Sequence, residues 1–116
     1  MLLLLDCDGT LETGQPPGPV KLNQLNFLMG RGFVVVIVSE SGNCANLPLP
    51  RVVVPGNRLQ ALVSARLRYP NHKCIYISDN PGDDINAQRA GCDYLHPSKW
   101  NEFYEQVVKS LTPSRP

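Results

Sequence analysis

Hydrophobic and polar positions alternate along the chain in blocks that predict strands and helices in turn. Short apolar runs bounded by polar or turn-forming residues are typical of buried strands. Five such runs occur, at residues 2–5, 33–38, 51–54, 74–77 and 92–95. Between them, apolar residues three and four positions apart predict amphipathic helices. The predicted helices cover residues 20–29, 57–67 (with Leu67 on the apolar face), 83–90 and a last helix that begins after Ser98 as its N-cap and buries Trp100 and Phe103.

This alternation predicts an α/β fold. Strands that alternate with helices form a parallel sheet with right-handed crossovers and helices on both faces. We therefore expect a three-layer, Rossmann-like sandwich around a parallel sheet of about five strands. A chain of 116 residues, 42% of them hydrophobic, is long enough for one core but not two. The expected organisation is one core domain over residues 1–112, with a C-terminal tail at 113–116.

Targeting signals and cysteine usage both point to the cytoplasm. The apolar run at the N-terminus is too short for a signal peptide, and no segment is long enough to cross a membrane. The four cysteines form no CxxC pair and no cluster with histidine, so the sequence predicts neither a zinc site nor a disulfide framework. Two of them open strands and could lie near one another, but we expect all four to be buried thiols. They are Cys7, Cys44, Cys74 and Cys92.

Two carboxylates follow the first apolar run directly. Asp6 and Asp8 are two positions apart, and alternate residues of an extended strand point to the same side, so both can serve one centre. Like charges held so close repel each other unless a cation or a proton lies between them. The alternative is an ordinary surface turn, because Asp and Gly are common turn residues.

Polar residues also follow two other predicted strands. Ser39 comes after the run 33–38, and the acidic segment 78–84 comes after the run 74–77. In an open parallel sheet, binding sites lie beyond the carboxyl ends of the strands. We therefore expect these residues to meet Asp6 and Asp8 at one edge of the sheet.

The same residues resemble the motifs of the haloacid dehalogenase-like (HAD) hydrolases. Most members of that superfamily are magnesium-dependent phosphatases that act through a phospho-aspartate. The first motif, DxDGT, is matched by Asp6-Cys7-Asp8-Gly9-Thr10, and the second, a Ser or Thr after a hydrophobic strand, by Ser39. The fourth motif, GDxxxD with a trailing AxxAG, is closely matched by Ser78-Asp79-Asn80-Pro81-Gly82-Asp83 with Ala87, Ala90 and Gly91.

The resemblance implies a catalytic role for each carboxylate of the first motif. Asp6 would be the nucleophile that forms a mixed anhydride with the phosphoryl group. Asp8 would protonate the leaving group and then activate the water. Mg²⁺, which prefers oxygen ligands, would be bound by Asp6, Asp79 and the backbone carbonyl of Asp8.

The resemblance also implies supporting roles around this centre. Ser39 would donate a hydrogen bond to a phosphoryl oxygen. Asp83 would lie behind the metal ligands or bind the ion through a water molecule. Gly9 and Thr10 would support the turn, and Asp84 would be favoured at a helix N-terminus by the helix dipole.

The third motif of the family, usually a lysine and less often an arginine, has no clear match. Lys73 immediately precedes the strand 74–77, which at about 3.3 Å a residue places it some 16 Å from Asp79, at the wrong edge of the sheet. Arg58 lies near the start of the helix 57–67, which begins at the catalytic edge, and its planar guanidinium suits phosphate. We expect Arg58 to bind phosphate, with Asn57 or no cation as the alternatives. Ser78, in place of the usual glycine, is a milder departure.

The short connections of the chain limit the substrate. Residues 9–38 and 55–73 each have room for little more than one helix, so the cap domains found in many family members are missing. An open site suggests a bulky phosphorylated substrate, such as a nucleic-acid end or a phosphoprotein, or a cap supplied by a second copy of the chain in a homo-oligomer. Five of the ten acidic residues lie in the two site segments, so the remaining surface is net basic and weakly favours an anionic partner. The loop 40–50 lies beside Ser39, where it can contribute to specificity.

Three functions are compatible with these patterns. The first is a magnesium-dependent phosphohydrolase or phosphotransferase, supported by Asp6, Asp8 and Asp79. The second is a catalytically weak member kept as a binding or regulatory module, suggested by the missing lysine and by Ser78. The third is a phospho-acceptor receiver domain, which is disfavoured because such domains carry the acceptor aspartate on the third strand, and the run 51–54 has no acid.

Overall fold

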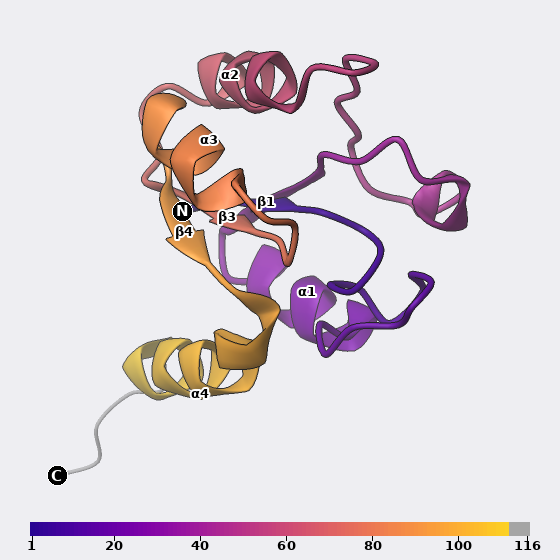
Figure 1. The fold of residues 1–116 in the computed structure, drawn as a ribbon. Coiled ribbons are helices and arrows are strands. Elements are labelled where there is room, and N and C mark those ends of the chain that lie inside the picture. Colours follow the sequence, from indigo (N-terminus) through magenta and orange to yellow (C-terminus); the bar gives the residue numbers. More distant parts are fainter. Residues whose placement is uncertain (112–116) are drawn as a thin grey trace, which may run out of the picture.

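Four parallel strands form the centre of the molecule (Figure 1). They are β1 (Leu2–Leu5), β2 (Val34–Ile37), β3 (Cys74–Ile77) and β4 (Asp93–Leu95), arranged in the order β2-β1-β3-β4. The computed structural model describes residues 1–111, so the predicted tail at 113–116 lies outside the described residues. All three strand pairings are parallel, and β1 pairs along its whole length with both β2 and β3. The prediction of a parallel α/β fold is confirmed.

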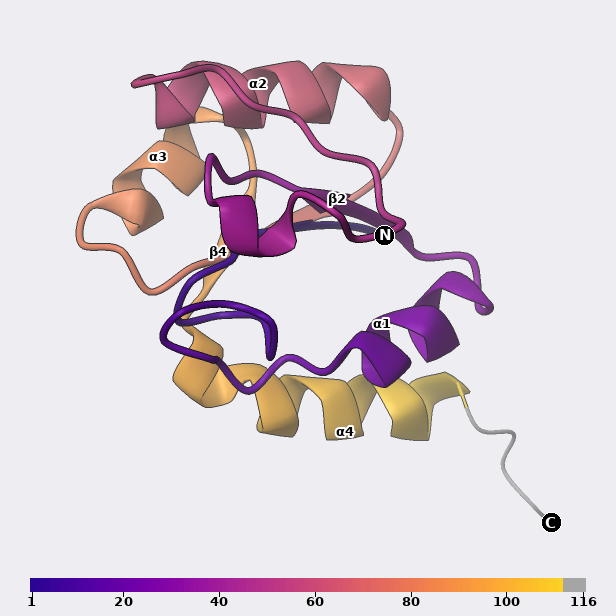
Figure 2. The same cartoon turned by 90° about the vertical axis from the view of Figure 1, so that its right-hand side faces the viewer.

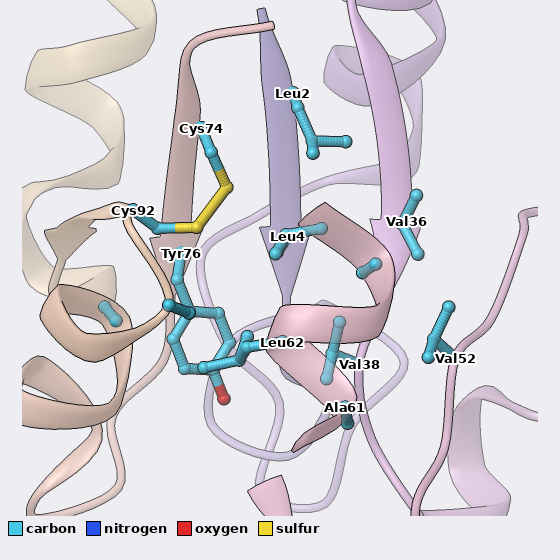
Figure 3. Packing of buried hydrophobic residues seen from close by; sticks show 13 residues of the cluster. Leu2, Leu4, Val36, Val38, Val52, Ala61, Leu62, Cys74, Tyr76 and Cys92 are labelled. Carbon is cyan, nitrogen blue, oxygen red and sulfur yellow. A yellow bond between two sulfur atoms is a disulfide. The ribbon is translucent and has the colours of Figure 1, made fainter. Parts of the chain in front are cut away.

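Helices cover both faces of this sheet (Figure 2). They are α1 (Leu22–Met29), α2 (Arg58–Arg68), α3 (Asp83–Arg89) and α4 (Trp100–Leu111). Leu2 and Leu4 of β1 point into the core under α2 and α3, whereas Leu3 and Leu5 point into the core formed with α1 and α4. Figure 3 shows the first of these two cores, which includes Leu4 of β1 and Leu62 of α2. Because β1 is buried on both faces, its sequence is a continuous apolar run rather than an alternating one.

The last helix packs through one aromatic face. Trp100 is fully buried, stacks on Tyr104 and donates a hydrogen bond from Nε1 to Gln24 Oε1 of α1 at 2.7 Å. The helix begins at Trp100, after a 3-10 turn, η2 (Pro97–Lys99). The prediction that Ser98 is the N-cap of the last helix is wrong. Instead, Nδ1 of His96 accepts the backbone N–H of Ser98 and caps the 3-10 turn.

The predicted third strand at 51–54 is not part of the sheet. Its only sheet pairing within residues 1–111 is a bridge from Arg51 to Ile37, so the sheet has four strands rather than about five. The side chain of Arg51 turns back to donate to the carbonyls of Ser39 and Ser41, at 2.8 and 3.1 Å. Prolines at both ends of the segment limit its pairing further, because proline has no N–H to donate.

Helix boundaries differ from the predictions by one or two residues. The helix α1 begins two residues later than predicted, and α2 one residue later, with Asn57 as its N-cap. The helix α3 ends, and β4 begins, within one residue of the predicted positions. Leu67 does not lie on the buried face of α2, and 69% of its surface is exposed. The buried stripe runs through Ala61, Leu62 and Ala65, and two residues beyond Ala65 the helix has turned by about 200°.

The expectation of buried free thiols is wrong. The structure pairs Cys7 with Cys44 and Cys74 with Cys92 as disulfides, with Cα–Cα separations of 6.1 and 4.8 Å. Cys74 begins β3 and Cys92 immediately precedes the neighbouring β4, so the sheet itself brings them together (Figure 3). Cys44 reaches Cys7 through the loop after β2. Disulfides are rare in the reducing cytosol, so the pairing does not support the cytoplasmic prediction.

No helix within residues 1–111 has the length and apolar character needed to cross a bilayer.

Candidate active site

The carboxyl ends of β1, β2 and β3 bring polar residues together, as the sequence predicts. Asp6 follows β1, and its Oδ1 lies 3.5 Å from Arg58 Nη1 at the start of α2. Its Oδ2 accepts a hydrogen bond from Asn80 Nδ2 at 2.7 Å, and Asn80 belongs to the segment after β3. Ser39, after β2, also acts on this carboxylate, because its hydroxyl lowers the pKa of Asp6. Four parts of the chain therefore converge on one carboxylate.

Burial dominates the electrostatics of Asp6, which is only 4% exposed. Desolvation raises the pKa of this carboxyl, and the charge of Asp83 adds to the increase. The guanidinium of Arg58, the backbone N–H of Cys7 and the Ser39 hydroxyl each favour the charged form and offset part of it. A buried carboxylate with a raised pKa is a common feature of functional sites.

Arg58 links the nucleophile candidate to the end of β2. In addition to its ion pair with Asp6, its Nη1 donates a hydrogen bond to the backbone carbonyl of Val38. Asn57 was the alternative to Arg58 for binding phosphate. It is instead the N-cap of α2, and its side chain accepts the N–H of Gln60 at 3.0 Å. Of these two residues, only Arg58 has its side chain at Asp6.

Lys73 lies at the opposite edge of the sheet, where the sequence places it. It immediately precedes β3, and its Nζ lies 3.9 Å from Oδ2 of Asp93 at the start of β4. Both side chains are mostly exposed. This lysine therefore takes no part in the polar cluster around Asp6.

Asp8 is held by hydrogen bonds rather than by burial. Its Oδ1 accepts from the backbone N–H of Gln15 at 2.9 Å, from Ser41 Oγ at 3.1 Å and from Asn43 Nδ2 at 3.1 Å. These donors hold the pKa of Asp8 below its ordinary value. Sequence reasoning missed Ser41, Asn43 and Gln15, because small polar residues in an irregular loop are equally typical of turns.

Gly9 lets the segment after β3 approach the first motif. Its φ is +75°, and a Cβ at this position would lie 2.0 Å from Oδ2 of Asp79. The Asp79 carboxylate thus packs directly on the backbone of the turn that carries Asp8. Thr10 supports this turn through its backbone, because its N–H donates to the Cys7 carbonyl and its carbonyl accepts the N–H of Val20. Its Oγ1 is buried without a hydrogen-bond partner in residues 1–111.

Asp83 organises the segment between β3 and α3. This buried carboxylate accepts the Tyr76 hydroxyl at 2.9 Å and the Ser78 hydroxyl at 2.5 Å on Oδ2, and Asn86 Nδ2 at 3.2 Å on Oδ1. Burial raises the pKa of Tyr76, which keeps its hydroxyl a donor. Ser78, which stands where the HAD pattern has glycine, thus has a defined contact. Asp84 is exposed in the first turn of α3, as predicted.

The donor types at this edge fit Mg²⁺. Within residues 1–111, no three acidic, histidine or cysteine side chains are grouped so that they could hold a metal by themselves. Mg²⁺ needs fewer, because one or two carboxylates suffice when water and substrate phosphate complete its oxygen ligands. The buried Asp6 and the Asp79 carboxylate that packs against Gly9 are of the type that could serve as such ligands. Oδ1 of Asp6 lies beside Arg58 and Oδ2 accepts from Asn80, and each carboxylate oxygen keeps a further lone pair that can face a metal ion.

A pocket of about 220 Å³ opens beside this cluster. It lies between the end of β2, the segment 52–56 and the start of α2, and its lining includes Ser39 and Arg58. Val52 and Val54 make part of its wall apolar, and Glu40 lies in the lining next to Ser39. The pocket can accept a small group beside Ser39 and Arg58.

Comparisons with known protein families, curated proteins and solved structures give no match to this chain.

Proposed function

We propose that this protein is a magnesium-dependent phosphomonoesterase that acts through an aspartyl-phosphate, as its resemblance to the HAD hydrolases implies. The observation that carries the proposal is the buried Asp6 carboxylate with Arg58 at 3.5 Å and the Ser39 hydroxyl beside it. A nucleophile flanked by a cation and a hydroxyl donor is arranged to receive a phosphoryl group. The proposal includes a capless, three-layer Rossmann-like fold.

In the first half-reaction, an Asp6 oxygen attacks phosphorus and the bond to the leaving oxygen breaks. The leaving oxygen takes a proton from Asp8, which must gain that proton as substrate binds because the donors on its Oδ1 favour the charged form before then. Arg58 and Ser39 bind the phosphoryl oxygens and stabilise the charge that spreads over them. When bound by Asp6, Asp79 and the Asp8 carbonyl, Mg²⁺ supplies the positive charge that lets an anionic substrate approach a carboxylate.

In the second half-reaction, water attacks the phosphorus of the acyl phosphate. Asp8 takes a proton from this water, and the bond between Asp6 and phosphorus breaks to release inorganic phosphate. The three donors on Asp8 Oδ1 favour its charged form, which is the form that can act as this base. The Asp6 carboxylate is regenerated, and the cycle balances with one water consumed.

The open edge of the sheet suits a large phosphorylated substrate. The connections 9–38 and 55–73 contain one α-helix each and no separate cap. We propose a nucleic-acid end or a phosphoprotein as substrate, with the pocket of about 220 Å³ accepting the group next to the phosphate. A second copy of the chain could instead supply the missing cover. The proposal includes no membrane partner.

A second candidate function is that of a binding or regulatory module. The observation that favours it is the engagement of both Asp6 oxygens, by Arg58 and by Asn80. If these contacts persist when Mg²⁺ and a phosphate are present, they weaken Asp6 as a nucleophile, because both of its oxygens stay engaged.

Phosphate release from an aryl phosphate, with Mg²⁺ or with EDTA, tests the proposal. We expect metal-dependent turnover that falls by roughly 1,000-fold or more in Asp6→Asn. Asp84→Asn is the matched control, because Asp84 is an exposed neighbouring acid and should leave turnover unchanged. A folded wild type that releases no phosphate from the aryl ester, a 5′-phosphorylated oligonucleotide or a phosphopeptide would favour the binding module.

A further inference from the structure

The loop after β2 folds over Asp8 and contacts its carboxylate twice. Ser41 Oγ and Asn43 Nδ2 both donate to Asp8 Oδ1 at 3.1 Å. The backbone N–H of Gln15, from the loop after β1, donates to the same oxygen at 2.9 Å. Donors from two separate loops thus fix the direction in which this carboxylate points.

Ser41 connects this contact to the rest of the site. Its backbone N–H donates to Ser39 Oγ at 3.1 Å, and its carbonyl accepts from Arg51 Nη2 at 3.1 Å. Its side chain also caps a 3-10 turn, η1 (Gly42–Cys44), by accepting the N–H of Asn43. A shift of Ser41 would therefore move both a donor to Asp8 and a partner of Ser39.

One covalent bond anchors this loop. Among residues 42–46 only Cys44 is buried. The backbone hydrogen bonds of the turn are long, because the N–H of Cys44 donates to the Ser41 carbonyl at 3.4 Å and the N–H of Ala45 to the Gly42 carbonyl at 3.2 Å. Cys44 forms its disulfide with Cys7, which lies between Asp6 and Asp8 in the first motif. The exposed loop is thus tied directly to the segment whose carboxylates it contacts.

We propose that Ser41 and Asn43 are positioning residues for Asp8, and that the Cys7–Cys44 disulfide makes this positioning redox-dependent. We call the loop 40–47, which carries both residues, the clamp. The expected effect of the clamp on turnover rests on the proposed phosphatase function. A dithiol reductant opens the clamp by thiol–disulfide exchange. One reductant thiolate attacks a cysteine sulfur, the Sγ–Sγ bond breaks, the second reductant thiolate closes the reductant's own disulfide, and Cys7 and Cys44 are left as thiols.

Hydrogen exchange tests the clamp without reference to activity. The experiment uses a background variant that combines Cys74→Ala with Cys92→Ala, so that Cys7–Cys44 is its only disulfide. Both substitutions lie at the opposite edge of the sheet from Asp6 and should leave turnover unchanged. The protein is reduced with dithiothreitol, and reduction is verified by counting two free thiols. We expect reduction to speed amide exchange in residues 40–47 by at least about tenfold. Exchange in α4 should stay unchanged. Two counted thiols with no change in residues 40–47 would overturn the proposal.

Kinetics test the positioning role. We expect Ser41→Ala and Asn43→Ala to lower kcat by roughly 10- to 100-fold with KM within about twofold, because a small misplacement of a catalytic group is costly. Ser41→Thr keeps the hydroxyl and should recover most of the loss. Reduction should lower kcat in the background variant and have no further effect on Cys44→Ala in that background. An equal loss in Ser41→Thr and Ser41→Ala, or a kcat that reduction leaves unchanged, would refute the positioning role.

The two proposals fail in different ways. An oxidised wild type that releases no phosphate contradicts the phosphatase function, while the exchange experiment still decides whether the disulfide holds the loop. Turnover that is normal after reduction contradicts the clamp and leaves the phosphatase function intact.

Discussion

Arg58 Nη1 lies 3.5 Å from Asp6 Oδ1 and also donates to the carbonyl of Val38. One side chain from the start of α2 thus joins the ends of β1 and β2. Both contacts are made by one nitrogen, Nη1, whose two N–H groups can face two acceptors at once.

Replacing Arg58 tests its role in binding phosphate. We expect Arg58→Ala to lower kcat/KM for an aryl phosphate by roughly 100- to 1,000-fold, because the developing charge on the phosphoryl group loses its cation. Arg58→Lys should recover part of the loss, since it keeps the charge without the planar guanidinium. Arg68→Ala, an exposed arginine in the last turn of the same helix, is the control and should match the wild type. Equal activity in Arg58→Ala and Arg68→Ala would contradict the phosphate-binding role.

A Cβ at position 9 should disrupt the site. Gly9→Ala adds an atom 2.0 Å from Asp79 Oδ2 and also strains a backbone with φ of +75°. Gly91→Ala has a similar φ of +78° but meets nothing within 4 Å, so it measures the backbone cost alone, about 1–2 kcal/mol. We expect urea unfolding to show a larger loss in Gly9→Ala, together with loss of turnover. The same small loss in both variants would mean that Asp79 moves away freely.

Neutralising Asp6 should stabilise the protein. Because burial raises the pKa of Asp6 in the folded state, its ionisation opposes folding, and stability falls as the pH rises from the unfolded value of about 3.8 through the raised one. Asp6→Asn should therefore unfold at a higher temperature than the wild type at pH 7 while it loses activity. The difference should shrink below about pH 4, where the carboxyl is neutral in both states. A lower unfolding temperature for Asp6→Asn at pH 7 would show that the contact with Arg58 outweighs desolvation.

The buried carboxylate of Asp83 should couple to Tyr76. Asp83→Ala leaves two buried hydroxyls without their acceptor, and we expect it to cost about 2–3 kcal/mol of unfolding free energy. Tyr76→Phe removes one of these donors, so Asp83→Ala should cost about 1 kcal/mol less in that background. Denaturant unfolding of the double-mutant cycle measures this, with the exposed Asp84→Ala as control. Additive losses would contradict the coupling.

The strands and the location of the site were predictable from local sequence. Each leucine of β1 is buried, and a continuous apolar run between turn residues has few other solutions. The run 51–54 satisfies the same local rule and still fails to pair beyond one bridge, because its neighbouring prolines and the Arg51 contacts are not part of an apolar pattern. Arg58 was predictable because the helix that leads into a parallel strand, here β3, begins at the carboxyl edge of the sheet.

The partners of the Asp6 and Asp8 carboxylates were not predictable in this way. Asn80 reaches Asp6 and Asn43 reaches Asp8 across 74 and 35 positions of the chain. No local pattern marks such a pair, since a single asparagine in a loop is equally typical of a turn. The two disulfides were missed for the same reason, because a pairing of cysteines depends on the distance between them in space.

The sequence by itself determined the alternation of strands and helices, and from it the edge of the sheet where Asp6, Asp8 and Ser39 would lie. These follow from burial, because apolar periodicity is set by which side of each element faces the core. Only the tertiary structure decided the hydrogen bonds, the ion pair and the disulfides that distinguish Asp6 from Asp8. Those interactions depend on separations of a few ångströms between distant loops, which no periodicity encodes.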